Sequence, residues 1–246
     1  MKTLFHRFLE QWKRRKRLSA SCSEVLEAEQ EFYKAFVKPG MVVFDIGANV
    51  GNITSLFAKQ TTENGQVHAF EPGSDTYEKL VHRIAGEKVP QVVVNRLALS
   101  DTIGKAKFHV YDKDHSTLNS LADRPLENYG IDLEKQVEEV CTMTVDAYCR
   151  DHDVKSIDLL KIDVEGAELA VLRGASEMFA KKQVRCCIFE FGQTLFDMGE
   201  KPEAIIEFMN THGYVIRNLI KGDPLFPGGE KVSSAQFSMH IAEPSL

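Results

Sequence analysis

The stretch MVVFDIGANVGNIT, residues 41–54, sets the architecture that we expect for the whole chain. It opens with an apolar, β-branched run of the kind that forms a strand buried on both faces. Gly47 and Gly51 then interrupt the run, and Ile53 and Leu56 begin a helical spacing. A strand, a tight glycine turn and a helix in this order predict a nucleotide-binding unit, in which the backbone approaches the ligand and the helix N-terminus faces it.

Asp45 indicates which nucleotide this turn binds. A dinucleotide fingerprint has glycine at this position, because a pyrophosphate must contact bare backbone. A carboxylate would repel that pyrophosphate and attract an ammonium or sulfonium group. S-adenosylmethionine (SAM) carries both cations and no phosphate. The sequence therefore favours SAM and disfavours an NAD-dependent oxidoreductase.

A second acidic residue stands where a ribose ligand is expected. Residues 66–70 are predicted to form the next strand, and Glu71 follows that strand twenty residues after Gly51. An acid at about this distance, at the end of the second strand, accepts hydrogen bonds from ribose hydroxyls. The glycine turn is a weak signal by itself, but its combination with Asp45 and Glu71 is specific.

These motifs resemble those of the FkbM-type family of SAM-dependent methyltransferases. The matching segments are DIGANVGNIT (45–54), AFEPG (69–73), LALSD (97–101) and DLLKIDVEGAELAVLRGA (158–175). The resemblance implies an α/β, Rossmann-like class I methyltransferase fold, whose seven-stranded, mostly parallel sheet has helices on both faces and an antiparallel hairpin at one edge. It also implies a methyltransferase domain over residues 39–246, preceded by an N-terminal helical extension over residues 1–38.

The resemblance names SAM as the cofactor and supplies further candidate contacts. In the family the LALSD segment borders the adenine ring, which implicates the backbone of Leu99 and the side chain of Ser100. The complete set of candidate cofactor residues is Asp45, Gly47, Ala48, Asn49, Gly51, Asn52, Glu71, Pro72, Leu99, Ser100 and Asp163.

Hydrophobic periodicity predicts the elements outside these motifs. We expect helices over residues 24–37, 75–85, 166–182 and 202–212, and strands over residues 92–99, 157–162, 184–189, 214–220 and 236–241. The last two strands are the ones expected to form the edge hairpin.

Residues 101–156 depart from the alternation of strands and helices and form an expected insertion. Residues 105–111 alternate like a strand, residues 139–143 could pair with them, and a polar stretch lies between. A connection of this length within a compact domain is more often functional than idle. The resemblance implies that this insertion covers the substrate side and selects the acceptor.

Acids that follow predicted strands are the candidate catalytic groups. Ligands of open α/β sheets lie beyond the carboxyl ends of the strands. With Asp45 and Glu71 assigned to SAM, Asp163 and Glu190 remain for the substrate side. A hydroxyl acceptor must lose its proton, and a carboxylate within hydrogen-bond reach can remove it. We predict Asp163 as the base, with Glu190 and His115 as further candidates.

Each of these side chains also has a structural interpretation. Asp163 could orient the amino group of SAM or cap the following helix. Glu190 could pair with Lys161 or Arg173, and His115 could be an ordinary loop histidine. Hard oxygen ligands of the type that magnesium uses are present at Asp146, Asp163, Glu165 and Glu190. Their spacing does not establish a site, and we predict no metal centre.

Composition limits the partners and the compartment. With a net charge of −6 over 246 residues, the chain lacks the excess of basic residues that is typical of nucleic-acid-binding proteins. The fourth predicted strand ends in KIDV (161–164), not in the proline-rich loop of amino-directed DNA and RNA enzymes. Five cysteines without a C-x-x-C pair indicate reduced thiols and a cytoplasmic protein. No apolar run reaches the roughly 18 residues needed to span a bilayer.

Residues 1–17 differ from the rest of the chain, since they hold seven lysines and arginines and one acidic residue. Their apolar side chains fall at helical spacing. Two interpretations stay open: a helix docked on the domain's own surface, or a basic amphipathic helix that makes peripheral contact with an anionic membrane.

Together these features predict a SAM-dependent methyltransferase. The resemblance implies O-methylation of a hydroxyl on a sugar, glycan or other small-molecule acceptor, with no nucleic-acid partner. Two alternatives remain: a SAM-binding partner module that performs no chemistry, and a methyltransferase acting on a lipid-linked glycan at the membrane surface. The oligomeric state and the identity of the acceptor do not follow from the sequence.

Overall fold

A computed structural model describes residues 22–123, 125–126, 133–226 and 237–245. The elements in chain order are α2 (Cys22–Phe36), β1 (Val42–Ile46), α3 (Asn52–Thr61), β2 (Gln66–Phe70), α4 (Ser74–Glu87), β3 (Val92–Asn95), β4 (Ala98–Leu99), β5 (Gly104–Val110), the 3-10 helix η1 (Lys113–Leu118), β6 (Gln136–Met143), α5 (Val145–Asp151), β7 (Leu159–Ile162), α6 (Glu168–Arg173), α7 (Ser176–Ala180), β8 (Cys187–Gly192), α8 (Gln193–Asp197), α9 (Pro202–Thr211), β9 (Tyr214–Asn218) and β10 (Phe237–Pro244).

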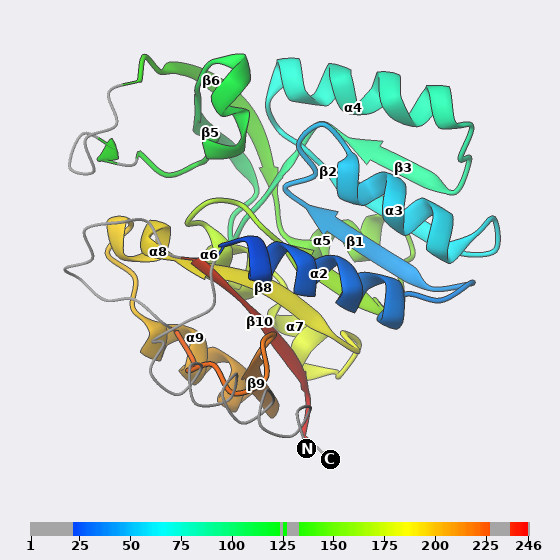
Figure 1. The fold of residues 1–246 in the computed structure, drawn as a ribbon, viewed down its shortest axis with the longest axis vertical. Coiled ribbons are helices and arrows are strands. Elements are labelled where there is room, and N and C mark those ends of the chain that lie inside the picture. The colour runs from blue at the N-terminus through cyan, green and yellow to red at the C-terminus, as the bar shows by residue number, and fades with distance from the viewer. Residues whose placement is uncertain (1–21, 124, 127–132, 227–236, 246) are drawn as a thin grey trace, which may run out of the picture.

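The main sheet has seven strands in the order β3-β2-β1-β7-β8-β10-β9. Its strands pair in parallel except β10, which is antiparallel to both β8 and β9. The chain adds β2 and β3 on one side of β1 and later adds β7 and β8 on its other side, so the strand order reverses between β1 and β7. The predicted fold class is confirmed, including the antiparallel hairpin at the edge (Figure 1).

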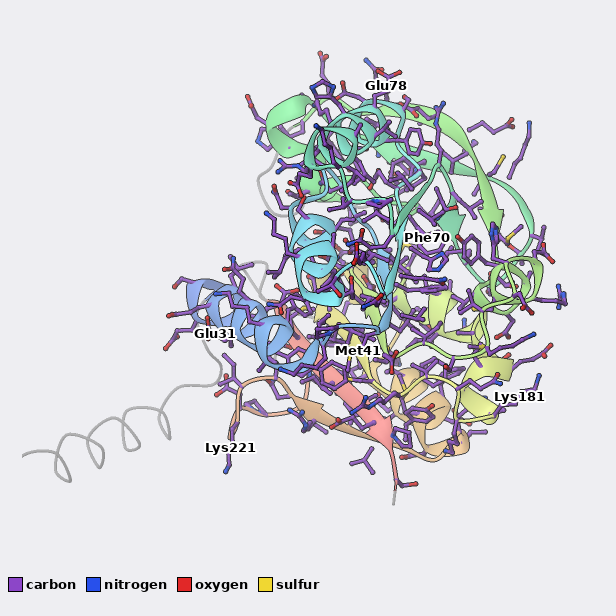
Figure 2. The ribbon with its side chains drawn as sticks, turned by 90° about the vertical axis from the view of Figure 1, so that its right-hand side faces the viewer. Glu31, Met41, Phe70, Glu78, Lys181 and Lys221 are labelled. Carbon is purple, nitrogen blue, oxygen red and sulfur yellow. The ribbon has the colours of Figure 1, made fainter. Side chains whose placement is uncertain are left out.

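Helices cover both faces of this sheet because its strands bury alternate side chains on opposite sides. In β1, Val43 packs in a cluster with α2 and α3, whereas Phe44 and Ile46 pack in a larger cluster with α5, α6, α7 and α9. Figure 2 shows Phe70 in the interior and Glu31 at the periphery. Truncating a core residue such as Phe44 to alanine would cost about 3–5 kcal/mol.

Two predicted elements are divided in the structure. The strand expected over residues 92–99 ends at Asn95, whose side-chain amide donates to the carbonyl of Ala69. Residues 98–99 then form β4 in a second sheet. The helix expected over residues 166–182 is divided into α6 and α7 at Gly174, which packs so closely on the carbonyl of Ser100 that a Cβ would overlap it.

The predicted insertion contributes β5 and β6 to a second, small sheet in the order β4-β6-β5, and β4 precedes the insertion in the chain. The expected pairing of residues 105–111 with 139–143 is confirmed, with Lys107 opposite Glu139 in an antiparallel register. Figure 1 shows β5 and β6 beyond the carboxyl end of β1. The insertion therefore lies on the side of the sheet where ligands of α/β proteins bind.

The N-terminal extension is described only from residue 22 onward. The helix expected over residues 24–37 is present as α2, and the amphipathic segment predicted over residues 1–17 lies outside the described residues. Within the described part, no helix combines the length and apolar character needed to cross a membrane. Cys149, Cys186 and Cys187 are buried free thiols, and Cys141 is an exposed one.

Candidate functional site

One cavity of about 270 Å³ lies at the carboxyl ends of β1, β2 and β7, under the insertion. Eight of the candidate cofactor residues line it: Gly47, Ala48, Asn49, Asn52, Glu71, Pro72, Leu99 and Asp163. Ligands at the switch point of an open parallel sheet occupy this location. The structure thus brings most of the predicted cofactor residues into one cavity.

The glycine turn after β1 forms the floor of the cavity. Gly47 has a φ of 78° and lies directly against the backbone of Asp163, so that a Cβ would overlap the carbonyl oxygen of that residue. Only glycine fits both the left-handed backbone and the close approach. Gly51 has a φ of 84° but packs against Leu80 of α4 and is not among the lining residues. Gly51 therefore sets the close packing of the start of α3 on α4, and its predicted contact with the cofactor stays a prediction.

Glu71 is a buried carboxylate with several internal partners. Its Oε1 accepts hydrogen bonds from the Thr76 hydroxyl (2.6 Å) and from the Gly73 amide (3.0 Å). Its Oε2 accepts one from the Asn49 amide at 2.9 Å. Burial raises the pKa of the carboxyl, and these three donors act in the opposite direction. Because a carboxylate oxygen can accept more than one hydrogen bond, Oε2 keeps capacity for a ribose hydroxyl.

Apolar side chains form the wall that an adenine ring would need. They come from the main sheet, the connection to β4 and the insertion: Phe70, Leu97, Ala98, Leu99, Phe108 and Leu121. Ser100, predicted as a contact, does not line the cavity. Its carbonyl packs on Gly174 and its hydroxyl contacts Asp101 at 3.4 Å. The contact predicted for the Ser100 side chain is thus not among those that the cavity lining supports, and it stays a prediction.

Asp45 faces a protein cation and does not line the cavity. Its carboxylate is fully buried, accepts a hydrogen bond from the Thr54 hydroxyl (2.6 Å) and lies 3.1 Å from the ammonium of Lys161. Asp45 and Lys161 are opposite each other in the register of β1 and β7. The expectation that the SAM cations compensate Asp45 is thus corrected: the chain supplies the cation itself.

Asp163 joins this pair to the cavity. Its Oδ2 lies 3.3 Å from the Lys161 ammonium, and its side chain is 36% exposed. Lys161 also donates to the carbonyl of Gly47 at 3.3 Å. Asp163 is therefore fixed from one side by a buried cation and is open to the cavity on the other. The structure retains it as the leading candidate base.

A group of three carboxylates is formed by Asp163, Glu165 and Glu190. One carboxylate oxygen of each residue lies within 4.8 Å of those of the other two. Glu190 lies inside β8, not at the end of a strand as predicted, and it is hydrogen-bonded to Asp163. Burial, followed by the charges of Glu165 and Asp163, raises the pKa of Glu190 well above its ordinary value. Asp146 lies apart from the group, where it accepts hydrogen bonds from the first turn of α7.

His115 is not placed as a catalytic base. It lies in η1 with its side chain 44% exposed, and its Nδ1 is 2.7 Å from the carboxylate of Asp112. Asp112 also caps η1 by accepting hydrogen bonds from two backbone amides. The ring therefore points to the helix cap, whereas its neighbours Ser116 and Thr117 line the cavity.

A strap, defined here as residues 113–122, connects both sides of the cavity. At one end the side-chain amide of Asn49 donates to the carbonyl of Ser116 at 3.2 Å. At the other, the hydroxyl of Ser120 lies 2.7 Å from the carbonyl of Glu165 and 3.2 Å from that of Val164. The insertion thus closes over both the glycine turn and the Asp163 loop, which is the segment 163–167 between β7 and α6.

Sequence reasoning missed two kinds of lining residue. From the sequence, Lys161 is expected only as a partner of Glu190, although a lysine within a buried strand must be paired. The insertion is expected to cover the acceptor, and in the structure Phe108 and the strap line the same cavity as the glycine turn. No motif in the sequence marks them, because their position depends on how the insertion folds back.

Comparisons with known proteins agree with this geometry. A family model described as Methyltransferase FkbM domain matches residues 45–216. The chain is 30% identical over 222 residues to the 31-O-demethyl-FK506 methyltransferase FkbM of Streptomyces tacrolimicus, covering 79% of each chain. It is 26% identical over 192 residues to the 2-O-methyltransferase NoeI of Sinorhizobium fredii, covering 75% of this chain and 77% of NoeI.

A solved structure supports the fold. SMU.1697c of Streptococcus mutans, determined in complex with S-adenosylhomocysteine (SAH), superimposes with a TM-score of 0.51 at 8% identity. The match covers 89% of this chain and 97% of that one. At this level of identity the similarity concerns the architecture alone.

Proposed function

This chain belongs to the FkbM family of methyltransferases, and we propose that it transfers the methyl group of SAM to a hydroxyl of a sugar, glycan or other small-molecule acceptor. The observation that carries the proposal is a single cavity lined by the glycine turn after β1, by Glu71 and by Asp163. Glu71 is the acid predicted to bind the ribose, and Asp163 is an accessible carboxylate. The relatives named above include a 31-O-demethyl-FK506 methyltransferase and a 2-O-methyltransferase, which supports oxygen as the acceptor atom.

The residues present fit SAM. The backbone of Gly47 lines the cavity and can contact the amino acid part, Oε2 of Glu71 can accept from the ribose, and the apolar wall around Leu99 and Phe108 suits an adenine ring. When bound, SAM supplies an electrophilic methyl group. The protein contributes alignment of the acceptor and exclusion of water, which the strap favours by covering the cavity.

Asp163 is proposed to accept the proton of the acceptor hydroxyl. Its carboxylate lies 3.3 Å from the Lys161 ammonium and is open to the cavity, and burial together with neighbouring carboxylates raises the pKa of Glu190 beside it. A carboxylate that is held by a cation on one side and accessible on the other has the geometry that general-base catalysis needs.

Binding of SAM tests the first part of the proposal. Calorimetry of the full chain with SAM, SAH and NAD should show binding of the first two and none of NAD. Binding of NAD without SAM would overturn the proposed function.

Methyl transfer tests the second part. Donor-labelled SAM incubated with a panel of hydroxylated sugars, glycans and small molecules should identify a labelled product. We expect Asp163→Asn to slow labelling by about 10²–10⁴-fold while SAH affinity stays within several-fold. Asp146→Asn is the matched control, since it removes the same charge from the α7 cap, away from the cavity. Labelling at the wild-type rate in Asp163→Asn would exclude this residue as the base.

A further inference from the structure

Lys161 is the one positively charged side chain among the described residues that line the cavity. It is 2% exposed, and its ammonium has three partners: Asp45 (3.1 Å), Asp163 (3.3 Å) and the carbonyl of Gly47 (3.3 Å). The ammonium thus forms ion pairs with two carboxylates and donates one hydrogen bond to the backbone. The charges of Asp45 and Asp163 raise the pKa of Lys161 against the effect of burial. Its positive charge is therefore permanent.

The other charged groups near this ammonium are negative. Glu71, Asp163 and Glu165 line the cavity, and Asp45 lies behind Lys161. Glu29 of α2, a buried acid that accepts from the Tyr33 hydroxyl at 2.5 Å, interacts with the same ammonium through its charge. The electrostatic potential of the cavity is thus a balance between several carboxylates and one fixed cation.

We propose that Lys161 determines how strongly the cavity distinguishes SAM from SAH. The two ligands differ by one methyl group and by the positive charge on sulfur. A fixed ammonium in the cavity wall disfavours the charged ligand relative to the neutral one, and the carboxylates have the opposite effect. This inference rests on the proposed function, because it requires SAM to occupy the cavity.

The expected effect is measurable because SAH is an internal reference. Both ligands share the adenine, the ribose and the amino acid part, so damage to the shape of the cavity weakens both. A change in the charge of the wall alters only their ratio. For charges several ångströms apart in a partly buried site, a change of about ten-fold in the affinity ratio is expected, equivalent to roughly 1.4 kcal/mol.

The first experiment is calorimetry of the full-length Lys161→Gln variant with SAM and with SAH at one pH near neutrality. Glutamine keeps a hydrogen-bond donor and removes the charge. We expect the ratio Kd(SAH)/Kd(SAM) to rise about ten-fold over the wild-type ratio. A parallel loss of both affinities with an unchanged ratio would overturn the inference, because that result describes a purely structural lysine.

The matched control removes the partner charge as well. The double variant Asp45→Asn/Lys161→Gln has the same net charge around the cavity as the wild type, so its ratio should return to within about two-fold of the wild-type value. Asp45→Asn alone removes one of the carboxylates that offset the ammonium and should lower the ratio. This single variant also decides the question if Lys161→Gln fails to fold, since a ratio equal to that of wild type would again overturn the inference.

Binding of the two ligands to the wild-type protein separates failure of the proposed function from failure of the role of Lys161. If the wild-type protein binds neither SAM nor SAH, the proposed function is wrong. If it binds both, and charge variants leave the ratio unchanged, only the assignment to Lys161 is wrong.

Discussion

The cavity has two halves that are built in different ways. The sheet half consists of the glycine turn, Glu71 and the Asp163 loop, where buried hydrogen bonds and close backbone contacts fix each group. The insertion half consists of Phe108 and the strap, which meets the sheet half through hydrogen bonds at Asn49 and at Ser120. The groups of the sheet half are thus fixed by the core, whereas the strap is held to them by a few hydrogen bonds.

The largest expected effect comes from the sheet half. Gly47→Ala would place a Cβ onto the carbonyl oxygen of Asp163, in a backbone conformation that L-residues avoid. We expect SAH affinity to fall by at least about a hundred-fold, since the turn and the Asp163 loop must separate by more than an ångström. Calorimetry and thermal unfolding measure the two consequences.

Gly40→Ala is the control for this variant. Gly40 also has a positive φ (85°), but no heavy atom lies within 4 Å of a Cβ built there. Its strain of about 1–2 kcal/mol should lower stability while leaving SAH affinity unchanged. Equal affinities for the two variants would show that close packing at Gly47 does not shape the cavity.

Glu71→Ala should give the second-largest effect. It removes a ribose acceptor and leaves the donors of Asn49, Gly73 and Thr76 without their partner. Unpaired buried donors cost about 1–3 kcal/mol each, so we expect SAH affinity to fall by about ten-fold or more, together with a loss of stability. Thr76→Val separates the two consequences, because it removes one internal donor at a residue outside the cavity lining. It should lower stability and spare affinity; a matching loss of affinity would contradict the ribose assignment.

Glu168 offers a pH test of the loop that carries Asp163. Burial raises the pKa of this carboxyl to about 7, although it accepts hydrogen bonds from the Val164 and Gly166 amides. A folded-state pKa above the ordinary value of 4.5 means that the folded protein binds the proton more tightly than the unfolded chain. This contribution to stability is complete below pH 4.5 and is lost as the pH rises to 7.

We therefore expect the free energy of unfolding of the wild type to lose roughly 1–3 kcal/mol over that pH range relative to Glu168→Gln. Urea unfolding at several pH values measures the difference. Glu177→Gln, at an exposed position of α7, is the control and should follow the wild-type pH dependence. Parallel curves for wild type and Glu168→Gln would refute the assignment.

The smallest effect is expected in the insertion half. Ser120→Ala removes the hydroxyl that holds the strap to the carbonyls of Val164 and Glu165. We expect SAH to dissociate several-fold faster, with a stability loss of about 1–3 kcal/mol, because the buried hydroxyl donates to these carbonyls and also accepts from the Ala122 amide. Displacement of labelled SAH measures the rate. Thr102→Ala, at an exposed position in the turn before β5, should leave the rate unchanged. If both variants release SAH at the wild-type rate, the strap does not retain the ligand.

The difference between the halves also explains what could be predicted from the sequence. The turn after β1, the acid after β2 and Asp163 after β7 follow from local strand patterns and from the rule for parallel sheets. The Asp45–Lys161 pair does not, because it depends on β1 and β7 being neighbours in space although residues 47–158 separate them. Asp45, which the sequence predicts to contact SAM, forms a buried ion pair with Lys161.

The remaining errors have similar causes. Glu190 was placed at a strand end because the apolar run stops there, yet β10 continues the pairing as far as Gly192. His115 was chosen by residue type alone, and a local cap at Asp112 determines its direction. The strap has no periodic pattern, so neither its path nor its anchors could be derived before the fold was known.

The anchors of the strap have a consequence for the evolution and engineering of such enzymes. Ser116 is hydrogen-bonded to Asn49 in the glycine turn, and Ser120 is hydrogen-bonded to Glu165 in the Asp163 loop. One short segment therefore contacts both the proposed SAM site and the loop of the proposed base. Under the proposed function, replacing the insertion to change the acceptor would also replace part of the cavity wall around SAM. Chimeras that exchange this segment between relatives should be screened first for how long they hold SAH, since those that release it early will look inactive toward every acceptor.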